Sequence, residues 1–481
     1  MTGWPRVLDR RAGAALFVGS LLAAVVSSID GWGPAAVALG CAWMVGIASS
    51  RPDPEGVPVP RWTTVAIVLL LAATTFFVAC SSQPTVTLND GLGWDGRNYH
   101  ALYQIIRSGA SDRPPAFPFH QRLGVPALAS VLPLAERPAF LVLTLLFYAA
   151  ALGLLARFWP VRRSIRSDLT VAACGWLCLH WISPLRAGVC YPLNIDASTF
   201  FFDTAFLVLL GSPRPSRWLP AVAFVGALFK ESSLLTACLW LASTAVMSAL
   251  REGPRREALR RKLPILLVAA VTAFLGKSLA GSLIAHGPQL SGSIGETLRH
   301  WTEVRVDEPL NLLRLLAALV TVYGGWLLVP LAVVSAQPQG DRERPTDHLD
   351  DGTLLLWLAL WIGVTFFSGS DLSRFAWQAA PVAMTLGLST LQRGAPRCAL
   401  LLCLTSLPFT RLLTVVPSPL GGHLTPHHDY AGAYSWLMEY AHYSHVAAWA
   451  VFGLVYWLAA ERALRDAGSA DAAQRPVRSE P

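Results

Sequence analysis

Charged residues are scarce in this chain, and their scarcity excludes an ordinary water-soluble protein. Asp, Glu, Lys and Arg make up 14% of the 481 residues, against 53% hydrophobic residues, and the mean hydropathy is +0.46. Apolar runs close to the ~20 residues that a bilayer requires recur along the chain. Because a helix satisfies every backbone polar group inside lipid, the composition predicts an all-α, polytopic transmembrane helical bundle.

Several common catalytic motifs are also missing. The chain has no GxSxG serine elbow, no HExxH zinc motif and no glycine-rich P-loop. Their absence argues against a membrane hydrolase or an ATP-driven pump. The eight cysteines lie mostly inside apolar runs and form no CxxC pair, so the cysteines do not indicate metal or redox chemistry.

The net charge of +8 reflects basic clusters beside the apolar runs. Such a distribution marks the cytoplasmic side of a membrane protein, and nucleic acid is not expected as a partner. With both termini in the cytoplasm, most Lys and Arg residues fall on that side. We therefore expect a multi-pass protein of the inner (cytoplasmic) membrane, with the loop 81–138 as a large first outer loop that carries interfacial helices.

About 14 crossings, each near the length that a bilayer needs, are expected if one stretch counts as a hairpin. They are 13–29, 34–49, 63–80, 139–157, 169–185, 197–210, the hairpin in 218–250, 263–285, 309–335, 353–369, 375–392, 398–417 and 445–461. Basic clusters on both flanks of 218–250 require an even number of crossings. Two short helices that meet near Lys230 and Glu231 satisfy this requirement. Residues 123–135 are also apolar, but a crossing there would move the arginines at 157–166 to the outer side of the membrane. The preference of basic residues for the cytoplasmic side therefore predicts a half-helix or a surface helix.

The polar, glycine-rich stretch 89–122 holds most of the usable chemistry. We expect a short helix after Asp95 that ends at Gly109, with Tyr99, Leu102, Tyr103 and Ile106 along one face. That face is predicted to dip into the membrane interface. Asp95 itself has two interpretations, a helix N-cap and a functional carboxylate, and one structure can hold both.

Four short motifs give the chain a resemblance to a known family. They are Asp-Gly-x-x-Tyr at 95–99, Arg-Leu-x-x-Pro at 122–126, Phe-Lys-Glu-Ser-Ser at 229–233, and Asp-x-x-Arg-Phe at 371–375 before an apolar helix. Together they resemble bacterial GT-C glycosyltransferases, which are related to protein mannosyltransferases and aminoarabinose transferases. The resemblance covers roughly residues 60–415. It departs from the family pattern in the loose Lys-Glu-Ser-Ser motif and in the Phe that follows Arg374.

We expect three regions, of which the resemblance bears on the second. Residues 1–60 are two additional N-terminal transmembrane helices, residues 61–461 are a GT-C-like catalytic domain, and residues 462–481 are a disordered cytoplasmic tail. The resemblance also implies a polyprenyl-phosphate sugar donor, an outward-facing site and a lipid, glycan or protein acceptor.

The family's residue roles transfer to matching positions. Asp95 matches the catalytic base, with Asp90 as the runner-up. Lys230 and Arg374 are implied contacts for the donor phosphate, and Lys277 is a second lysine candidate for the same contact. The remaining substrate contacts expected are Glu231, Tyr99, His100 and Arg122. Other interpretations stay open: Lys230 and Glu231 as the wet tip of a hairpin, Lys277 as a snorkelling lysine, and Arg374 in a surface pair with Asp371.

Residues 427–429, with His427, His428 and Asp429, form the most metal-like cluster, and a divalent ion (Mg or Mn) is a minority hypothesis. Histidines at the membrane interface are the commoner explanation. A transporter or flippase of lipid-linked sugars is the main rival function, and a non-catalytic GT-C-like binding protein is the third.

Overall fold

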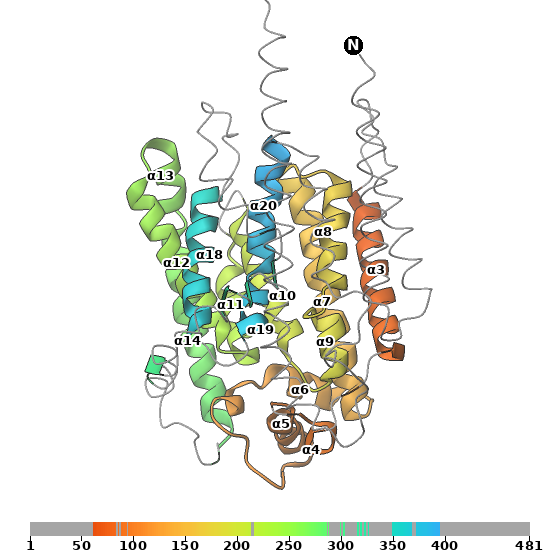
Figure 1. The fold of residues 1–481 in the computed structure, drawn as a ribbon. Helices are drawn as coiled ribbons and strands as arrows, with labels where there is room; N and C mark the ends of the chain where they lie inside the picture. The colour runs from red at the N-terminus through yellow and green to blue at the C-terminus, as the bar shows by residue number, and fades with distance from the viewer. Residues whose placement is uncertain are drawn as a thin grey trace, which may run out of the picture.

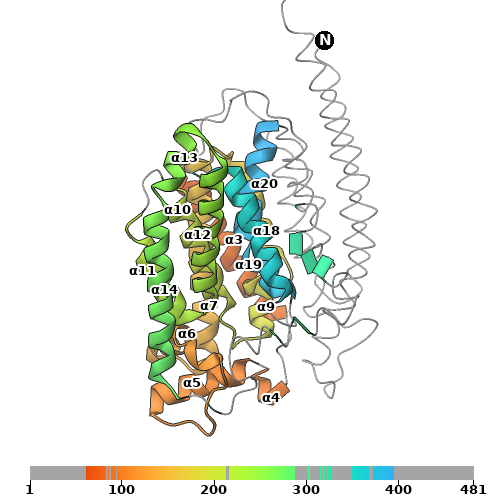
Figure 2. The same ribbon diagram turned by 90° about the vertical axis from the view of Figure 1, so that its left-hand side faces the viewer.

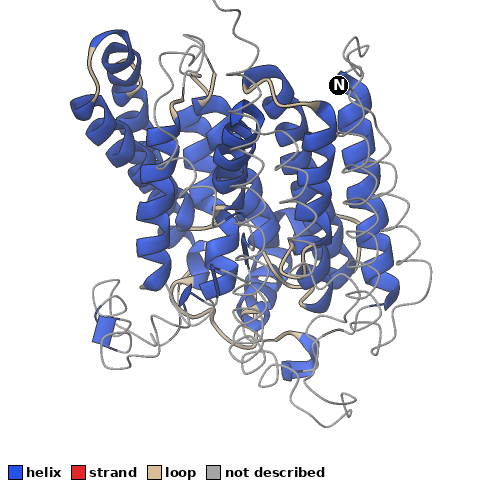
Figure 3. Ribbon diagram, turned by 45° about the horizontal axis from the view of Figure 1, so that its top comes forward, coloured by secondary structure: helices blue, strands red, loops and turns tan. Residues whose placement is uncertain are grey.

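The structure, a computed structural model, describes residues 61–82, 85, 88–93, 95–212, 216–285, 287, 349–367 and 372–394, with isolated positions between 299 and 326. Within these residues every regular element is a helix (Figure 3). The predicted crossings 13–29, 34–49, 309–335, 398–417 and 445–461, the tail 462–481 and the residues His427, His428 and Asp429 lie outside this part, in whole or for the most part.

Four helices are long and apolar enough to cross a membrane. They are Trp62–Ser81 within α3 (Arg61–Ser82), α7 (Glu136–Arg162), α12 (Ser232–Leu250) and the continuous stretch Gly253–Leu283, which holds α13 (Gly253–Arg260) and α14 (Leu263–Leu283). Exposed apolar side chains such as Leu267, Val271 and Phe274 line α14. A surface of this kind fits lipid, and the protein is a membrane protein with several apolar helices.

Shorter helices complete the bundle. They are α8 (Ser167–Leu179), α9 (Pro184–Cys190), α10 (Asp196–Leu210), α11 (Leu219–Phe229), α18 (Asp351–Phe366), α19 (Leu372–Gln378) and α20 (Ala380–Gly394). Two predicted crossings are broken. The segment 169–185 divides into α8 and α9 because Pro184 starts a new helix that the Ser183 side chain caps. The segment 375–392 divides at Ala379, just before Pro381.

The predicted hairpin in 218–250 is confirmed. Helix α11 ends at Phe229 and α12 begins at Ser232, so Lys230 and Glu231 form the break between two antiparallel helices. The short helix predicted in 123–135 is also present as α6 (Gly124–Val131). Gly124 is required there, because a Cβ at this position would lie 2.3 Å from the ring of Phe229.

One end of the bundle carries α4 (Leu88–Gly91), α5 (Gly96–Ser108), the 3-10 helix η2 (Phe119–Gln121) and α6, and the other end carries α13 (Figures 1 and 2). We call these the α5 end and the α13 end. Helix α5 begins and ends as the sequence predicts, with Gly109 in the left-handed conformation after its last turn. Its apolar face, however, packs with Val125, Ala129 and Leu193 instead of dipping into lipid.

Large aromatic residues fix how the spanning helices pack. Trp240 of α12 stacks on Trp357 of α18 with ring centroids 5.0 Å apart, and Trp361 stacks on Trp357 at 5.1 Å. Trp159 of α7 donates a 2.8 Å hydrogen bond from its indole nitrogen to Thr385 Oγ1 of α20. The Trp240–Trp357 and Trp159–Thr385 contacts join helices that are far apart in sequence, and they hold α18 and α20 against the rest of the bundle.

Candidate functional site

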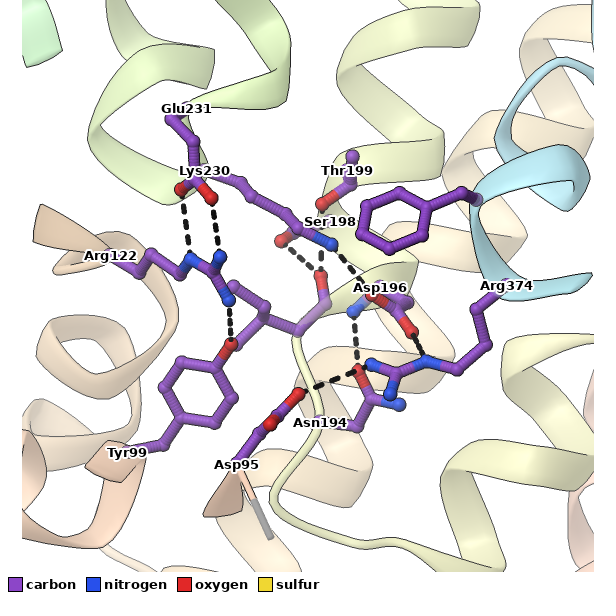
Figure 4. Close-up of polar contacts among 12 residues, drawn as sticks. Asp95, Tyr99, Arg122, Asn194, Asp196, Ser198, Thr199, Lys230, Glu231 and Arg374 are labelled. Carbon is purple, nitrogen blue, oxygen red and sulfur yellow. Dashed lines mark hydrogen bonds and ion pairs between the residues drawn. The ribbon is translucent and has the colours of Figure 1, made fainter. Parts of the chain in front are cut away.

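At the α5 end, six charged side chains from five parts of the chain lie together (Figure 4). Asp95 precedes α5, Asp196 begins α10, Lys230 and Glu231 occupy the break between α11 and α12, and Arg374 lies on α19. Arg122, between η2 and α6, is the sixth. The set has three positive and three negative side chains, so its formal charge is zero.

Four of these side chains form one chain of alternating charge. Lys230 Nζ donates to Asp196 Oδ1 at 3.0 Å, and Arg374 Nε donates to Asp196 Oδ2 at 2.8 Å. Arg374 Nη2 lies 3.7 Å from Asp95 Oδ2. Asp196 therefore holds two cations in place, and one of them reaches the carboxylate implied as the catalytic base.

Arg122 is the centre of a second chain. Its Nε donates to Glu231 Oε2 at 2.8 Å, its Nη2 donates to Glu231 Oε1, and its Nη1 donates to the Tyr99 hydroxyl at 2.9 Å. The two bonds to Glu231 make the bidentate pair that suits a guanidinium. The guanidinium carbon also lies 4.5 Å from the centroid of the Phe119 ring. This pair ties α5 and η2 to the start of α12.

Lys230 and Glu231 point to different partners, as expected for neighbours in the chain. Lys230 has an extended backbone (φ −160°, ψ 141°) at the end of α11, and its side chain is 6% exposed. Glu231 lies just outside the spanning helix α12. Burial by itself raises the pKa of the Glu231 carboxyl, but Arg122 more than reverses this and lowers the pKa from 4.5 to about 2.

A tyrosine fixes the approach to Asp95. The Tyr191 hydroxyl accepts hydrogen bonds from the backbone N–H groups of Asp95 and Gly96 at the first turn of α5. Its ring fills a notch at Gly93, where φ is +68° and a Cβ would lie 1.8 Å from the ring. The Asp95 side chain makes no capping hydrogen bond; instead its Oδ2 lies 3.7 Å from Arg374 Nη2. Asp95 therefore occupies the N-cap position of α5, as predicted, but its side chain does not cap the helix.

Helix α19 owes its placement to aromatic stacking. Trp377 stacks on His180 with ring centroids 4.5 Å apart and on Trp176 at 5.5 Å. Arg374, one turn earlier, points from this stack toward Asp196. A small pocket lies between α9, α10 and α19, and its lining includes Asn194, Asp196, Arg374 and Gln378. The pocket borders Asp196 and Arg374 of the charged cluster.

Three of the predicted site residues lie away from this cluster. Asp90 is exposed in a turn where Asn89 and Asp90 have positive φ angles of 52° and 57°. His100 Nδ1 lies 2.7 Å from Glu136 Oε2 at the start of α7. Lys277 is half-buried on α14. The structure brings Asp95, Tyr99, Arg122, Lys230, Glu231 and Arg374 together and places these three elsewhere.

Asp196 and Tyr191 are central to the site but were not predicted as site residues. Asp196 appears in the sequence as an acidic residue at the start of an apolar helix, which is the ordinary pattern of a helix N-terminus. Its one signal is that Asn194 and Asp196 place two polar side chains in a short connection, where Asn194 Oδ1 accepts from the Asp196 N–H at 2.8 Å. Tyr191 gives no signal in the sequence.

The residues that the structure describes contain no group of three or more His, Cys, Asp or Glu that fits a metal ion. Asp95 and Asp196, the two aspartates of the cluster, have Arg374 between them. The protein's own cations therefore face these carboxylates. Burial raises the pKa of Tyr99 and of Tyr191, so both phenols keep their protons and serve as hydrogen-bonding groups.

Comparison of the chain with protein-family models, with curated proteins and with solved structures finds no match.

Proposed function

We propose that the protein is a GT-C-like membrane glycosyltransferase that moves a sugar from a polyprenyl-phosphate donor to an acceptor hydroxyl outside the cytoplasm. The observation that carries the proposal is the approach of Arg374 to within 3.7 Å of Asp95, with Lys230 held on the other side of Asp196. A carboxylate and two cations, drawn from loops and helices far apart in sequence, thus share one site at the start of α5.

The reaction needs both kinds of group. The acceptor oxygen forms a bond to the anomeric carbon of the sugar, and the bond from that carbon to the phosphate oxygen breaks. The acceptor proton passes to a carboxylate of Asp95, and the bonding electrons leave with the phosphate. Arg374 and Lys230 offset the charge that develops on the leaving phosphate.

Exposure within the cluster supports this division of roles. The side chains of Asp95 and Arg374 are 28% and 23% exposed, whereas that of Lys230 is 6% exposed. An acceptor entering from water meets Asp95 before Lys230, and the small pocket beside Arg374 lies among α9, α10 and α19. Arg374 suits a phosphate because its planar fork matches two oxygens at once.

The proposed membrane and orientation follow from the predicted topology. That topology places the protein in the inner membrane in about 14 crossings, with both termini in the cytoplasm and the α5 end outward. Arg122 then has a structural role at the site, because its hydrogen bonds to Glu231 and Tyr99 hold η2 and α5 against the break between α11 and α12.

The test is transfer of radiolabelled sugar from polyprenyl-phosphate donors to acceptor by the purified full-length protein. Asp95→Asn should lower the rate by about 10²–10⁴-fold, the range for removal of a general base. Asp90→Asn is the matched control, because Asp90 lies five residues earlier but outside the cluster, and its rate should match wild type. Equal turnover by Asp95→Asn and wild type would remove Asp95 from the chemistry.

Two other functions are separate outcomes of the same preparation. A non-catalytic binding protein would bind the donor without transfer, and Arg374→Gln would weaken that binding. A flippase would move the labelled donor across reconstituted vesicles without changing it. Either result would overturn the glycosyltransferase proposal.

A further inference from the structure

The α13 end has an exposed surface on which positive charge predominates. It is formed by the end of α7, the connection from α10 to α11, and the connection from α12 to α14. Six exposed arginines, which we call the arginine face, define it: Arg157, Arg162, Arg217, Arg256, Arg260 and Arg261.

Carboxylates do not neutralise the arginine face. Among the side chains that the structure describes in these three places, the exposed acidic residues are Glu252 and Glu257. Glu257 is engaged by Arg261, whose Nε donates to Glu257 Oε1 at 3.1 Å, and such exposed pairs contribute little to stability. The other arginines keep their charge available to an outside partner.

Two tryptophans place the arginine face at a membrane boundary. Trp62 at the start of α3 and Trp218 ahead of α11 are 72% and 60% exposed. The guanidinium of Arg157 lies 5.8 Å from the centroid of the Trp62 ring, and that of Arg217 lies 5.8 Å from the Trp218 ring. Exposed tryptophans collect at the level of lipid headgroups, and an arginine over such a ring points its charge into the same layer.

Helix α13 adds two further arginines to the arginine face. Leu259 is buried against the bundle, while Arg256 and Arg260, four residues apart, are both exposed. Residues four apart lie on one face of a helix, so these two guanidinium groups stand side by side. Directly beyond them, α14 presents the exposed apolar residues Leu267, Val268 and Val271, which fit lipid tails.

We propose that the arginine face binds the phosphate groups of anionic phospholipids in the adjoining leaflet. Arginine forks match phosphate oxygens, and the neighbouring tryptophans and apolar helix surface belong to the same lipid boundary. The site is at the opposite end of the bundle from the charged cluster, and it does not depend on the proposed sugar transfer.

The test compares how well two lipids are retained by the full-length protein. Protein purified in mild detergent is mixed with equal amounts of phosphatidylglycerol and phosphatidylcholine, and bound lipids are counted by native mass spectrometry. Wild type should retain phosphatidylglycerol in preference, and high salt should reduce that preference. The double variant Arg256→Gln with Arg260→Gln should lose at least fivefold of the preference, since one basic residue near an anionic surface contributes about a fivefold change.

Two control variants distinguish lipid binding at the arginine face from a non-specific effect of the protein's net charge. Arg256→Lys with Arg260→Lys keeps both charges and should retain most of the preference. Arg113→Gln with Arg137→Gln removes two exposed arginines from the α5 end and should leave the preference unchanged. Equal retention of the two lipids by wild type, or an equal loss in the α5-end variant, would overturn the proposal.

Discussion

At the α5 end, six side chains of alternating sign lie against one another and are at most partly exposed. At the α13 end, by contrast, the arginines of the arginine face stand exposed with few carboxylates nearby. The α13 end does bury two cations, but each binds helix ends: Arg163 donates to the Leu349 carbonyl and to Asp351, and Lys262 donates to the Leu210 carbonyl. The comparison teaches that charge in the cluster has partners inside the protein, while charge on the arginine face needs partners outside it.

That difference has an energetic consequence. Removing one member of a buried ion pair leaves its partner uncompensated in a poorly solvated place, which costs far more than the pair contributes. An exposed arginine is solvated before and after substitution of its neighbours. Substitutions in the charged cluster should therefore alter stability or transfer, and substitutions on the arginine face should alter lipid binding alone.

The largest effect is expected for Asp196→Asn. This change leaves Lys230 and Arg374 facing each other without the carboxylate between them, and it should destabilise the protein by about 3–5 kcal/mol. Thermal unfolding in detergent measures the change. Asp90→Asn, at an exposed turn, should unfold like wild type, and a similar loss in both variants would show that the cluster has no special part in stability.

Glu231 gives the next largest effect and a pH dependence. Its folded pKa of about 2 lies below its ordinary value of 4.5, so the stabilisation is complete above pH 4.5 and is lost as the pH falls toward 2. The shift corresponds to about 3 kcal/mol. Melting temperatures of wild type and Glu231→Gln, followed from neutral pH into this window, should converge as the carboxyl takes up its proton. Parallel curves would contradict the pairing with Arg122.

Tyr191→Phe should have a smaller effect on stability. The ring still fills the notch at Gly93, but the N–H groups of Asp95 and Gly96 lose their acceptor, at a cost of about 1 kcal/mol. If Tyr191 positions Asp95, transfer should fall more than donor binding does. Gly93→Ala alters the same contact between Gly93 and the Tyr191 ring. It should lower the free energy of unfolding more than Tyr191→Phe does, because a Cβ would clash with the ring and the backbone at Gly93 is left-handed.

The smallest effect is expected for Arg256→Gln or Arg260→Gln. Both side chains are exposed on α13, so the free energy of unfolding in neutral detergent should change by no more than about 0.5 kcal/mol. Sugar transfer measured in the same detergent should equal that of wild type. A loss of several kcal/mol would show that the arginine face is part of the internal packing.

The sequence predicted the positions of several helices and of the hairpin. Apolar runs predicted α3, α7, α10 and α14, and the basic flanks of 218–250 predicted a hairpin that breaks at Lys230 and Glu231. The breaks at Ser183 and Ala379 were missed, although Pro184 and Pro381 mark both of them. The apolar face of α5 was assigned to the membrane interface, because a periodic pattern shows that a face is covered without showing by what.

The candidate site divides in the same way. Asp95, Lys230 and Arg374 were named from short motifs, and their convergence supports the proposal. Asp196 was passed over because an acidic residue that starts a helix is ordinary in sequence, and only its two cationic neighbours distinguish it. Tyr191 was missed because its role depends on the absence of a side chain at Gly93, about a hundred positions away in the chain.

By itself, the sequence determined that this chain enters a membrane as helices and which side chains interrupt the apolar runs, because hydropathy and charge act over neighbouring residues. The tertiary structure alone decided which of those charges compensate one another. Asp95, Asp196, Lys230 and Arg374 come from separate elements, and packing of α5, α10, the α11–α12 break and α19 sets the few ångströms that join them. Electrostatic interactions depend on such distances and on burial, and neither is written in the order of residues.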